Sequence, residues 1–450
     1  MKLLIKNGRV VDPRHAIDDL LDILVEEGKV KGIAPALEVE DAVVIDASNR
    51  VVTPGLIDMH VHFRQPGQDE YKETIRTGSR AAAKGGFTTV VCEPNTIPPI
   101  DCRKRIEQVL DIAKTDSIVN LYTTGCITKG MKGKELVSVK EGVKAGAVAL
   151  TDDGFPVVSS DVMEKAANEA IKYGIPICPH CEESRLKGRK EPFARWRREG
   201  LVRQRYYSEA AYIERDIHIV RDTHCPFHFL HVSLAKSVTH IARAKEEGLP
   251  VSAEVTPHHL TLTEEDAKHV GPNAKANPPL RTAKDVAAIK KALQDNIIDI
   301  IASDHAPHAP WEKSSNKPPS GVIGLETTLG MVLTHLVHSG VLSLHSAIAK
   351  MTANPARILN IRRGELKVGM PADITIIDLN REWVVDVEEF ESKGRNCPFD
   401  GWKLRGRAVM TIVAGKVAMN EGRVFDPPLQ DQRLLEQLSK EKEGEHATTK

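Results

Sequence analysis

The chain has 450 residues, which at about 150 residues per domain excludes a small disulfide-stabilised module and allows a large buried core. Lysine plus arginine and aspartate plus glutamate each number 62, and the resulting formal charge of zero excludes a global electrostatic field for nucleic acid or acidic membranes. Hydrophobic residues at 41% and charged residues at 28% exclude extensive disorder.

Residues 1–54 are short apolar runs separated by Gly, Asn and Asp, a texture typical of hairpins in a small sheet. The opening MKLLIKNGRVVD has too short an apolar stretch for a signal peptide. No stretch approaches the roughly 20 apolar residues of a membrane helix. Seven scattered cysteines indicate reduced thiols rather than a disulfide framework. We therefore expect a cytoplasmic protein with neither a membrane nor a nucleic-acid partner.

Residues 55–363 alternate strand-like and helical segments. The predicted strands are Leu56–Phe63, Phe87–Cys92, Ile118–Thr124, Ala147–Thr151, Ile175–His180, Phe227–Val232, Val251–Thr256 and Ile297–Ser303. Between the second and third strands, Asp101 precedes an apolar stripe from Ile106 to Ala113, which predicts an N-cap and an amphipathic helix. Eight such units predict an α/β fold, a (β/α)8 TIM-like barrel, with an open parallel sheet of seven or eight strands as the alternative.

Residues 364–425 return to the strand-rich texture of the beginning, in GELKVGMPADITIIDLN and AVMTIVAGKVAMNEGRV. We expect them to pair with residues 1–54 in one small β-sandwich satellite domain beside the barrel. Residues 426–450 are polar and charged and predict a tail without a site.

Groups that can bind metal gather at the predicted strand ends. His60 and His62 are two apart on the first strand, so strand alternation points both imidazoles to the same side. The other candidates are Asp152 and Asp153 after the fourth strand, His180 at the end of the fifth, His231 in the sixth, and Asp304 and His305 after the eighth. In a barrel these positions share the carboxyl-terminal face, where catalysis is located. Imidazoles with carboxylates favour zinc, and their number exceeds one tetrahedral site, which predicts a binuclear centre with a bridging carboxylate.

Three other features receive structural interpretations. Cys178 and Cys181 form a lone CxxC, which predicts packed free thiols rather than a zinc site. The pair His258 and His259 is either polar lining or a satisfied loop. The basic run 185–205 lacks stacking aromatics and indicates a solvated helix or subunit contact.

Several motifs together are typical of one known family. They are PGLIDMHVH, His62-Phe63-Arg64, Glu93-Pro94-Asn95-Thr96, Asn277-Pro278-Pro279-Leu280-Arg281, Ser303-Asp304-His305-Ala306-Pro307-His308, Gly324-Leu325-Glu326-Thr327 and GELKVGMPADITIID. In this combination the chain resembles the amidohydrolase superfamily over almost its whole length, and within it the type I dihydroorotases. Two departures are Ser320-Gly321, where relatives often carry an aromatic before the glycine, and Glu93, where methionine is common.

The resemblance implies two zinc ions per chain. The implied ligands are His60 and His62 on the first ion, His180 and His231 on the second, Asp152 as the bridge, and Asp304 as the residue that completes the coordination of the first ion. Asp153 stays open as an alternative bridge. Relatives with a carbamylated lysine carry it on the fourth strand, but here that strand reads AVALTDDG and Lys144 lies upstream.

The implied activity is the reversible cyclisation of N-carbamoyl-L-aspartate to L-dihydroorotate with loss of water, the third step of pyrimidine biosynthesis. A zinc-bound hydroxide is the implied nucleophile, and Asp304 is the implied general acid and base. The implied substrate-binding residues are His62, Arg64, Asn95, Asn277 and His308. Structural alternatives are an Arg64 ion pair with Asp69 or Glu70, a helix cap at Asn95 and a turn at Asn277.

Two other functions are alternatives. An allantoinase or dihydropyrimidinase should carry a bridging lysine on the fourth strand and lack Arg64, and the sequence has neither feature. A catalytically silent partner of aspartate carbamoyltransferase should have lost ligands, but all are present. A homodimer and association with aspartate carbamoyltransferase are the partner expectations beside the small-molecule substrate.

Overall fold

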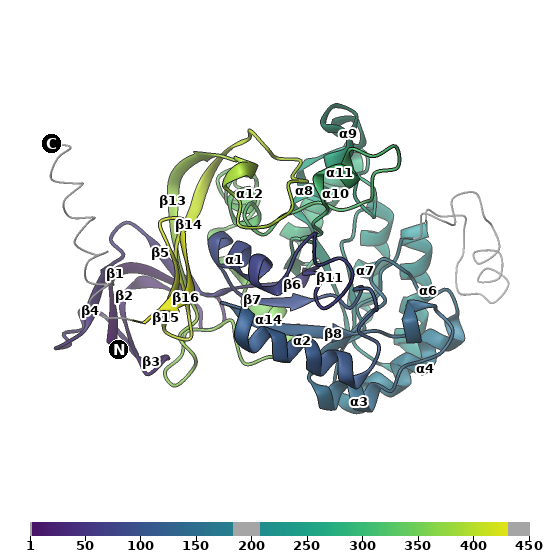
Figure 1. Ribbon diagram of the computed structural model, residues 1–450, viewed down its shortest axis with the longest axis horizontal. Helices are drawn as coiled ribbons and strands as arrows, with labels where there is room; N and C mark the ends of the chain where they lie inside the picture. The colour runs from purple at the N-terminus through teal and green to yellow at the C-terminus, as the bar shows by residue number, and fades with distance from the viewer. Residues whose placement is uncertain (1, 183–207, 431–450) are drawn as a thin grey trace.

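The computed structural model describes residues 2–182 and 208–430 (Figure 1). Parallel strands form its centre, and they are β6 (Leu56–Val61), β7 (Phe87–Cys92), β8 (Asn120–Gly125), β9 (Ala147–Leu150), β10 (Phe227–Phe229), β11 (Val251–Val255) and β12 (Ile300–Ile301). Two ladders, β6-β7-β8-β9 and β10-β11-β12, carry these strands. Almost all their residues are buried, as expected for parallel strands covered on both faces.

Single parallel bridges close the two ladders into a barrel. Ile177 bridges Leu150 on one side and Phe227 on the other, and His305 bridges Val61. The predicted fifth strand, Ile175–His180, is therefore reduced to one bridging residue, because prolines on both sides of Ile177–Cys178 lack the N–H that a longer ladder needs. The predicted (β/α)8 barrel is confirmed and the open sheet is wrong.

Helices surround the barrel in the described parts of the chain. They are α1 (Ile75–Gly85), α2 (Arg103–Asp116), α3 (Val139–Ala145), α4 (Ser160–Ala170), α6 (Ser208–Thr223), α7 (Ala235–Glu246), α8 (Pro257–Thr261), α9 (Glu264–Val270), α10 (Ala283–Gln294), α11 (Pro310–Lys313), α12 (Thr328–Val332), α13 (Leu344–Ala349) and α14 (Ala353–Ile358). None of these helices has both the length and the apolar character needed to cross a bilayer.

The predicted amphipathic helix is α2, but its expected N-cap is wrong. Cys102 occupies the cap position and makes no side-chain capping bond. The Asp101 carboxylate instead accepts hydrogen bonds from Arg105 Nη1 at 2.6 Å and from the Gly130 amide at 2.8 Å. Asp101 therefore connects the start of α2 to the loop after β8.

The two strand-rich ends form one nine-stranded sheet on one side of the barrel (Figure 1). Its strands are β1 (Lys2–Asp12), β2 (Ile17–Glu26), β3 (Lys29–Ala34), β4 (Val43–Asp46), β5 (Val51–Pro54), β13 (Ile374–Val384), β14 (Lys403–Val413), β15 (Lys416–Asn420) and β16 (Arg423–Leu429). The order is β16-β15-β14-β13-β5-β1-β2-β3, with β4 beside β1. The antiparallel β5–β13 ladder joins the two ends of the chain. The sheet extends past residue 425, and the rest of the predicted tail, 431–450, lies outside the described residues.

Candidate active site

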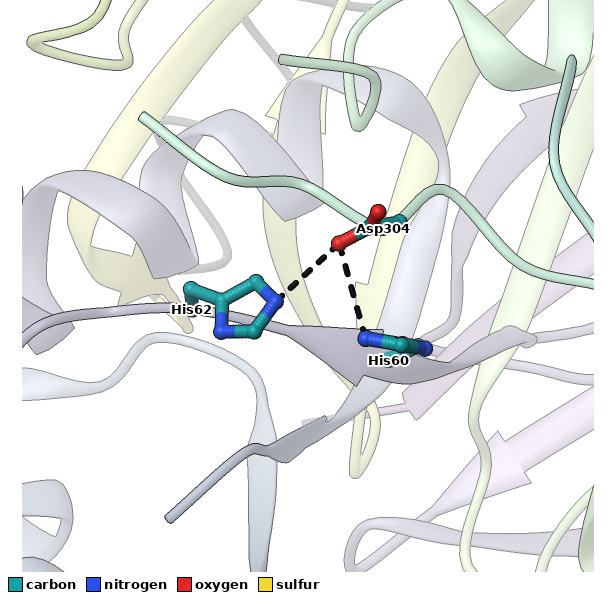
Figure 2. A group of neighbouring side chains, drawn as sticks. All are labelled: His60, His62 and Asp304. Carbon is teal, nitrogen blue, oxygen red and sulfur yellow. Dashed lines mark hydrogen bonds and ion pairs between the residues drawn. The ribbon is translucent and has the colours of Figure 1, made fainter. Parts of the chain in front are cut away.

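His60 in β6 and His62 just after that strand both face the carboxylate of Asp304 (Figure 2). Asp304 Oδ1 lies 3.0 Å from His62 Nε2 and 3.5 Å from His60 Nε2. Both imidazoles are buried. Asp304 has a left-handed backbone with φ of 47°, an uncommon conformation for aspartate that is often found at functional sites. The predicted grouping of these three residues is present.

The carboxylate that reaches the histidines after β9 belongs to Asp153, so the choice of Asp152 as the central carboxylate is wrong in this geometry. Asp153 oxygens lie 3.8 Å from His60 Nε2, 3.5 Å from His62 Nε2, 3.1 Å from His180 Nδ1 and 3.4 Å from His231 Nε2. The sequence left Asp153 open as the alternative bridge, because two adjacent aspartates follow the same strand.

Asp152 points away from the histidines and binds the loop after β8. Its Oδ1 accepts the Ile127 amide at 2.8 Å and the Thr128 amide at 3.1 Å, and Thr128 Oγ1 donates to Oδ2. Burial raises the pKa of Asp152 to about 6, against the hydrogen bonds from Thr128 and Ile127 that lower it. Asp152 therefore organises a loop beside the site.

His180 and His231 meet on the other side of Asp153. Their facing nitrogens, Nδ1 and Nε2, are 2.9 Å apart. The Asn277 amide nitrogen lies 3.0 Å from His180 Nε2, so Asn277 contacts a predicted ligand rather than only forming a turn. All four predicted histidines therefore converge on Asp153.

The donor set fits a divalent metal centre. Two sets of three residues each bring their ligand atoms within 4.8 Å of one another. One set is His60, His62 and Asp304, and the other is His60, Asp153 and His231. Among the described residues, the buried His60 Nε2 and His231 Nδ1 have no hydrogen-bond partner. Buried polar atoms are normally satisfied, so an unpartnered His60 Nε2 directed at the carboxylates of Asp153 and Asp304 fits a metal ligand. Imidazole and carboxylate ligands suit zinc and similar ions.

The central carboxylates are anionic at neutral pH. Burial raises the pKa of Asp304, but the charge of His60 and the contact with His62 outweigh it and lower the pKa to about 2. Burial likewise opposes ionisation of Asp153, yet its contacts with three histidines hold its pKa well below the usual range. Both groups can therefore act as ligands or proton acceptors.

Two buried carboxylates that the sequence interpretation missed hold this arrangement in place. Glu254 Oε1 lies 2.6 Å from His60 Nδ1, and Oε2 lies 3.2 Å from His228 Nε2. Asp58 accepts the His60 amide at 3.1 Å and the Ser303 amide at 3.1 Å. Such partners fix the orientation of a ligand imidazole. The available signal was a single carboxylate within each apolar strand, LIDMHV and VSAEV.

A cavity of about 670 Å³ opens beside this centre and is lined by Arg64 and Asn95. Asn95 Oδ1 lies 2.8 Å from His62 Nδ1, and α2 starts well beyond it, so the helix-cap alternative is wrong. The Arg64 guanidinium is buried and forms no hydrogen bond or ion pair with the described residues. Its alternative partners are occupied, since Asp69 pairs with Lys72 at 3.0 Å and Glu70 accepts the Gly67 amide.

His308 is held within its own loop. Its Nε2 donates to the Ser320 carbonyl at 2.9 Å, and burial together with the charge of Arg64 lowers its pKa to about 3. Asn396, which the sequence interpretation missed, accepts the His308 amide at 3.0 Å and donates to the carbonyls of Ala306 and Gly321. The segment between β13 and β14 thus ties both ends of the loop that carries His308.

The remaining sequence features lie outside the centre. Cys178 and Cys181 are buried free thiols, as predicted. His259 is satisfied by Thr256 Oγ1 and the Pro278 carbonyl, whereas His258 Nε2 is buried without a partner among the described residues. The basic run 185–205 lies outside the described residues.

Comparisons with known proteins agree with this geometry. The amidohydrolase family matches residues 51–418. A dihydroorotase of Citrifermentans bemidjiense is 45% identical over 423 residues, covering 93% of this chain and 99% of that protein. A dihydroorotase of Caldanaerobacter subterraneus is 42% identical, covering 95% and 99%.

Solved structures share the architecture. An L-hydantoinase from Arthrobacter aurescens superposes with a TM-score of 0.85 at 29% identity, covering 94% of this chain and 97% of that one. A dihydropyrimidinase from Brevibacillus agri gives a TM-score of 0.81 at 22% identity over 94% and 96%. With the near full-length match to curated relatives, these similarities show that the chain belongs to the amidohydrolase family and, within that family, to the dihydroorotases.

Proposed function

We propose that this pocket interconverts N-carbamoyl-L-aspartate and L-dihydroorotate. The observation that carries the proposal is the convergence of two anionic carboxylates, Asp153 and Asp304, with four histidines beside a buried arginine. The carboxylates and histidines provide metal ligands and a proton acceptor. The arginine provides a site for a carboxylate, which both molecules carry.

The proposed ligands are His60, His62 and Asp304 for one zinc ion and His180 and His231 for a second, with Asp153 between them. When bound, two zinc ions would supply Lewis-acid activation of water and of the scissile carbonyl. The chain's part in this chemistry is to orient the donors. The hydrogen bond that His60 Nδ1 donates to Glu254 leaves His60 Nε2 directed at the carboxylates.

Asp304 is the proposed proton carrier. Its low pKa keeps it ionised, so its carboxylate can accept a proton from the attacking water and deliver it to the departing ring nitrogen. In the cyclisation direction, the same oxygen removes a proton from the carbamoyl nitrogen as that nitrogen attacks the side-chain carboxyl carbon. The C–N bond forms, the C–O bond to one carboxyl oxygen breaks, and that oxygen leaves as water with one proton from Asp304 and one from solvent. Contact with both His60 and His62 holds the carboxylate at the reaction centre.

Arg64 is the proposed clamp for the substrate carboxylate that does not react. Its guanidinium can make two parallel bonds with a carboxylate, and it needs such a partner because it is buried without one among the described residues. Asn95 approaches from the loop after β7 and Asn277 from the loop after α9, and their amides can contact the ring. His62 and His308 complete the proposed substrate set.

Family members with a bridging lysine, such as the allantoinases and dihydropyrimidinases, are disfavoured by the residue that follows β9. Asp153 occupies the central position, and the nearest upstream lysine, Lys144, is 57% exposed on α3. A silent scaffold is disfavoured because every proposed ligand is present and converges. A homodimer, association with aspartate carbamoyltransferase and a cytoplasmic location stay predictions.

The test combines metal content with substrate choice on freshly purified protein. We expect near two zinc ions per chain by elemental analysis and ultraviolet-monitored turnover of dihydroorotate, with no turnover of allantoin or dihydrouracil. Activity on a control substrate alone would assign the chain to another branch. Absence of both metal and turnover would favour the silent scaffold.

Arg64→Ala is expected to raise KM for dihydroorotate by about tenfold to 100-fold, the equivalent of a lost charge-assisted hydrogen bond worth about 1.5–3 kcal/mol. Metal content should stay unchanged, because no hydrogen bond or ion pair joins Arg64 to a proposed ligand among the described residues. Steady-state kinetics with elemental analysis measures both. Loss of metal with unchanged KM would contradict the clamp.

A further inference from the structure

The outer wall of the cavity beside the metal centre is cationic. Besides Arg64 its lining includes Lys132 and Lys134, and among the described residues no acidic side chain lines it. The apolar lining residues include Ile97 and Phe155, both more than two-fifths exposed. The cavity therefore presents three positive charges on a chain whose formal net charge is zero.

Neither lysine is neutralised by a neighbour. Within residues 2–182 and 208–430, no hydrogen bond or ion pair is formed by the ammonium group of Lys132 or Lys134, and both side chains are exposed. The one acid next to them in sequence, Glu135, pairs with Lys129 instead. The field of these two ammonium groups is therefore directed into the cavity and the solvent in front of it.

The loop that carries the lysines is held firmly. Asp152 accepts bonds from Ile127 and Thr128, and Thr128 Oγ1 accepts the Gly133 amide at 2.9 Å. Asp101 accepts the Gly130 amide at 2.8 Å on the other side. Asp152 thus holds the start of this loop, Asp101 holds Gly130 just before Lys132, and Thr128 holds Gly133 just after it.

We propose that Lys132 and Lys134 form a cationic rim that draws the anionic substrate into the pocket. The inference rests on the proposed function. Carbamoyl aspartate carries two carboxylates in water and dihydroorotate carries one, so each must approach a neutral protein by a local field. A cleft lined by one sign of charge raises the encounter rate of an oppositely charged ligand by focusing that field.

The rim acts on the encounter with substrate and not on the chemical step. Lys132 and Lys134 make no contact with His62, Asp153 or Asp304 that would alter proton transfer. Their removal is therefore expected to change kcat/KM and to leave kcat unchanged. Because the overall equilibrium constant is fixed, kcat/KM in the two directions must fall by the same factor in any one variant, which gives an internal check.

The experiment compares Lys132→Gln/Lys134→Gln with the wild-type holoenzyme at several salt concentrations. We expect kcat/KM of the variant to be about fivefold lower than that of the wild type at about 0.02 M salt. This difference should vanish at about 0.5 M salt, where the screening length is below about 5 Å. Charge reversal, Lys132→Glu/Lys134→Glu, should square that factor to about 25-fold at low salt, since the change in charge doubles. Arginine at both positions should retain wild-type kinetics.

The matched control is Lys140→Gln/Lys144→Gln on α3, which removes the same charge from exposed positions outside the cavity. It should leave kcat/KM unchanged at every salt concentration. The proposal would be overturned if the rim and control variants lowered kcat/KM equally. It would also be overturned if the loss in the rim variant persisted at high salt, or if that variant lowered kcat. Wild-type protein that turns over no dihydroorotate would instead overturn the proposed function, so the two failures are distinguishable.

Discussion

Replacing Asp153 with asparagine is expected to empty the metal centre, whereas the same change at Asp152 should leave it filled. Asp153 oxygens lie within 3.8 Å of four histidines, so an amide there removes the charge that binds the ions. Loss of a residue that merely supports a ligand weakens metal binding by about tenfold to 100-fold, so loss of this carboxylate should cost at least as much. Turnover should fall at least in proportion.

Asp152→Asn is the matched control, since it is the same change one residue away. Its amide oxygen can still accept the Ile127 and Thr128 amides, so metal content should match the wild type. The free energy of unfolding should decrease by about 1–2 kcal/mol because a charged acceptor becomes neutral. Elemental analysis and denaturant unfolding measure these outcomes. Retained metal in Asp153→Asn together with metal loss in Asp152→Asn would reverse the assignment.

Asp304→Asn is expected to lower kcat by about 100-fold to 10,000-fold, the range for loss of a general acid and base. An amide cannot accept and return the proton, but its oxygen can still face His60 and His62. We therefore expect the fold to be retained, with most metal still bound through the histidines and Asp153. Circular dichroism, elemental analysis and steady-state kinetics on one preparation test all three.

The contrast with Asp153→Asn separates proton transfer from metal binding. Asp304→Asn should lose turnover with most metal bound, whereas Asp153→Asn should lose both together. A rate near that of the wild type in Asp304→Asn would remove Asp304 from proton transfer. A loss of turnover that parallels the loss of metal would leave it as a ligand alone.

Much of the site could be predicted because barrel topology converts chain position into spatial position. His60 and His62 share a face by strand alternation. His180, His231 and Asp304 follow later strands, and parallel strands of a closed barrel bring their carboxyl ends to one face. The sequence supplied the residue types and the count of strands, and the closure by Val61 and His305 brings the ends together.

The choice between Asp152 and Asp153 could not be made in this way. Strand β9 ends at Leu150, so the alternation that sets side-chain direction has stopped before either aspartate. The direction is decided by which carboxylate the backbone amides of Ile127 and Thr128 bind, and those amides belong to the loop after β8. A tertiary contact thus selected between two identical side chains.

Periodicity and the chemistry local to each strand are enough to predict the barrel, the returning sheet strands and the kinds of ligand. Which carboxylates support the ligands depends on contacts between distant parts of the chain. Glu254 meets His60 and Asn396 meets the His308 loop across long stretches of chain. Such pairings depend on how distant segments pack, because a buried donor must find an acceptor wherever the fold provides one.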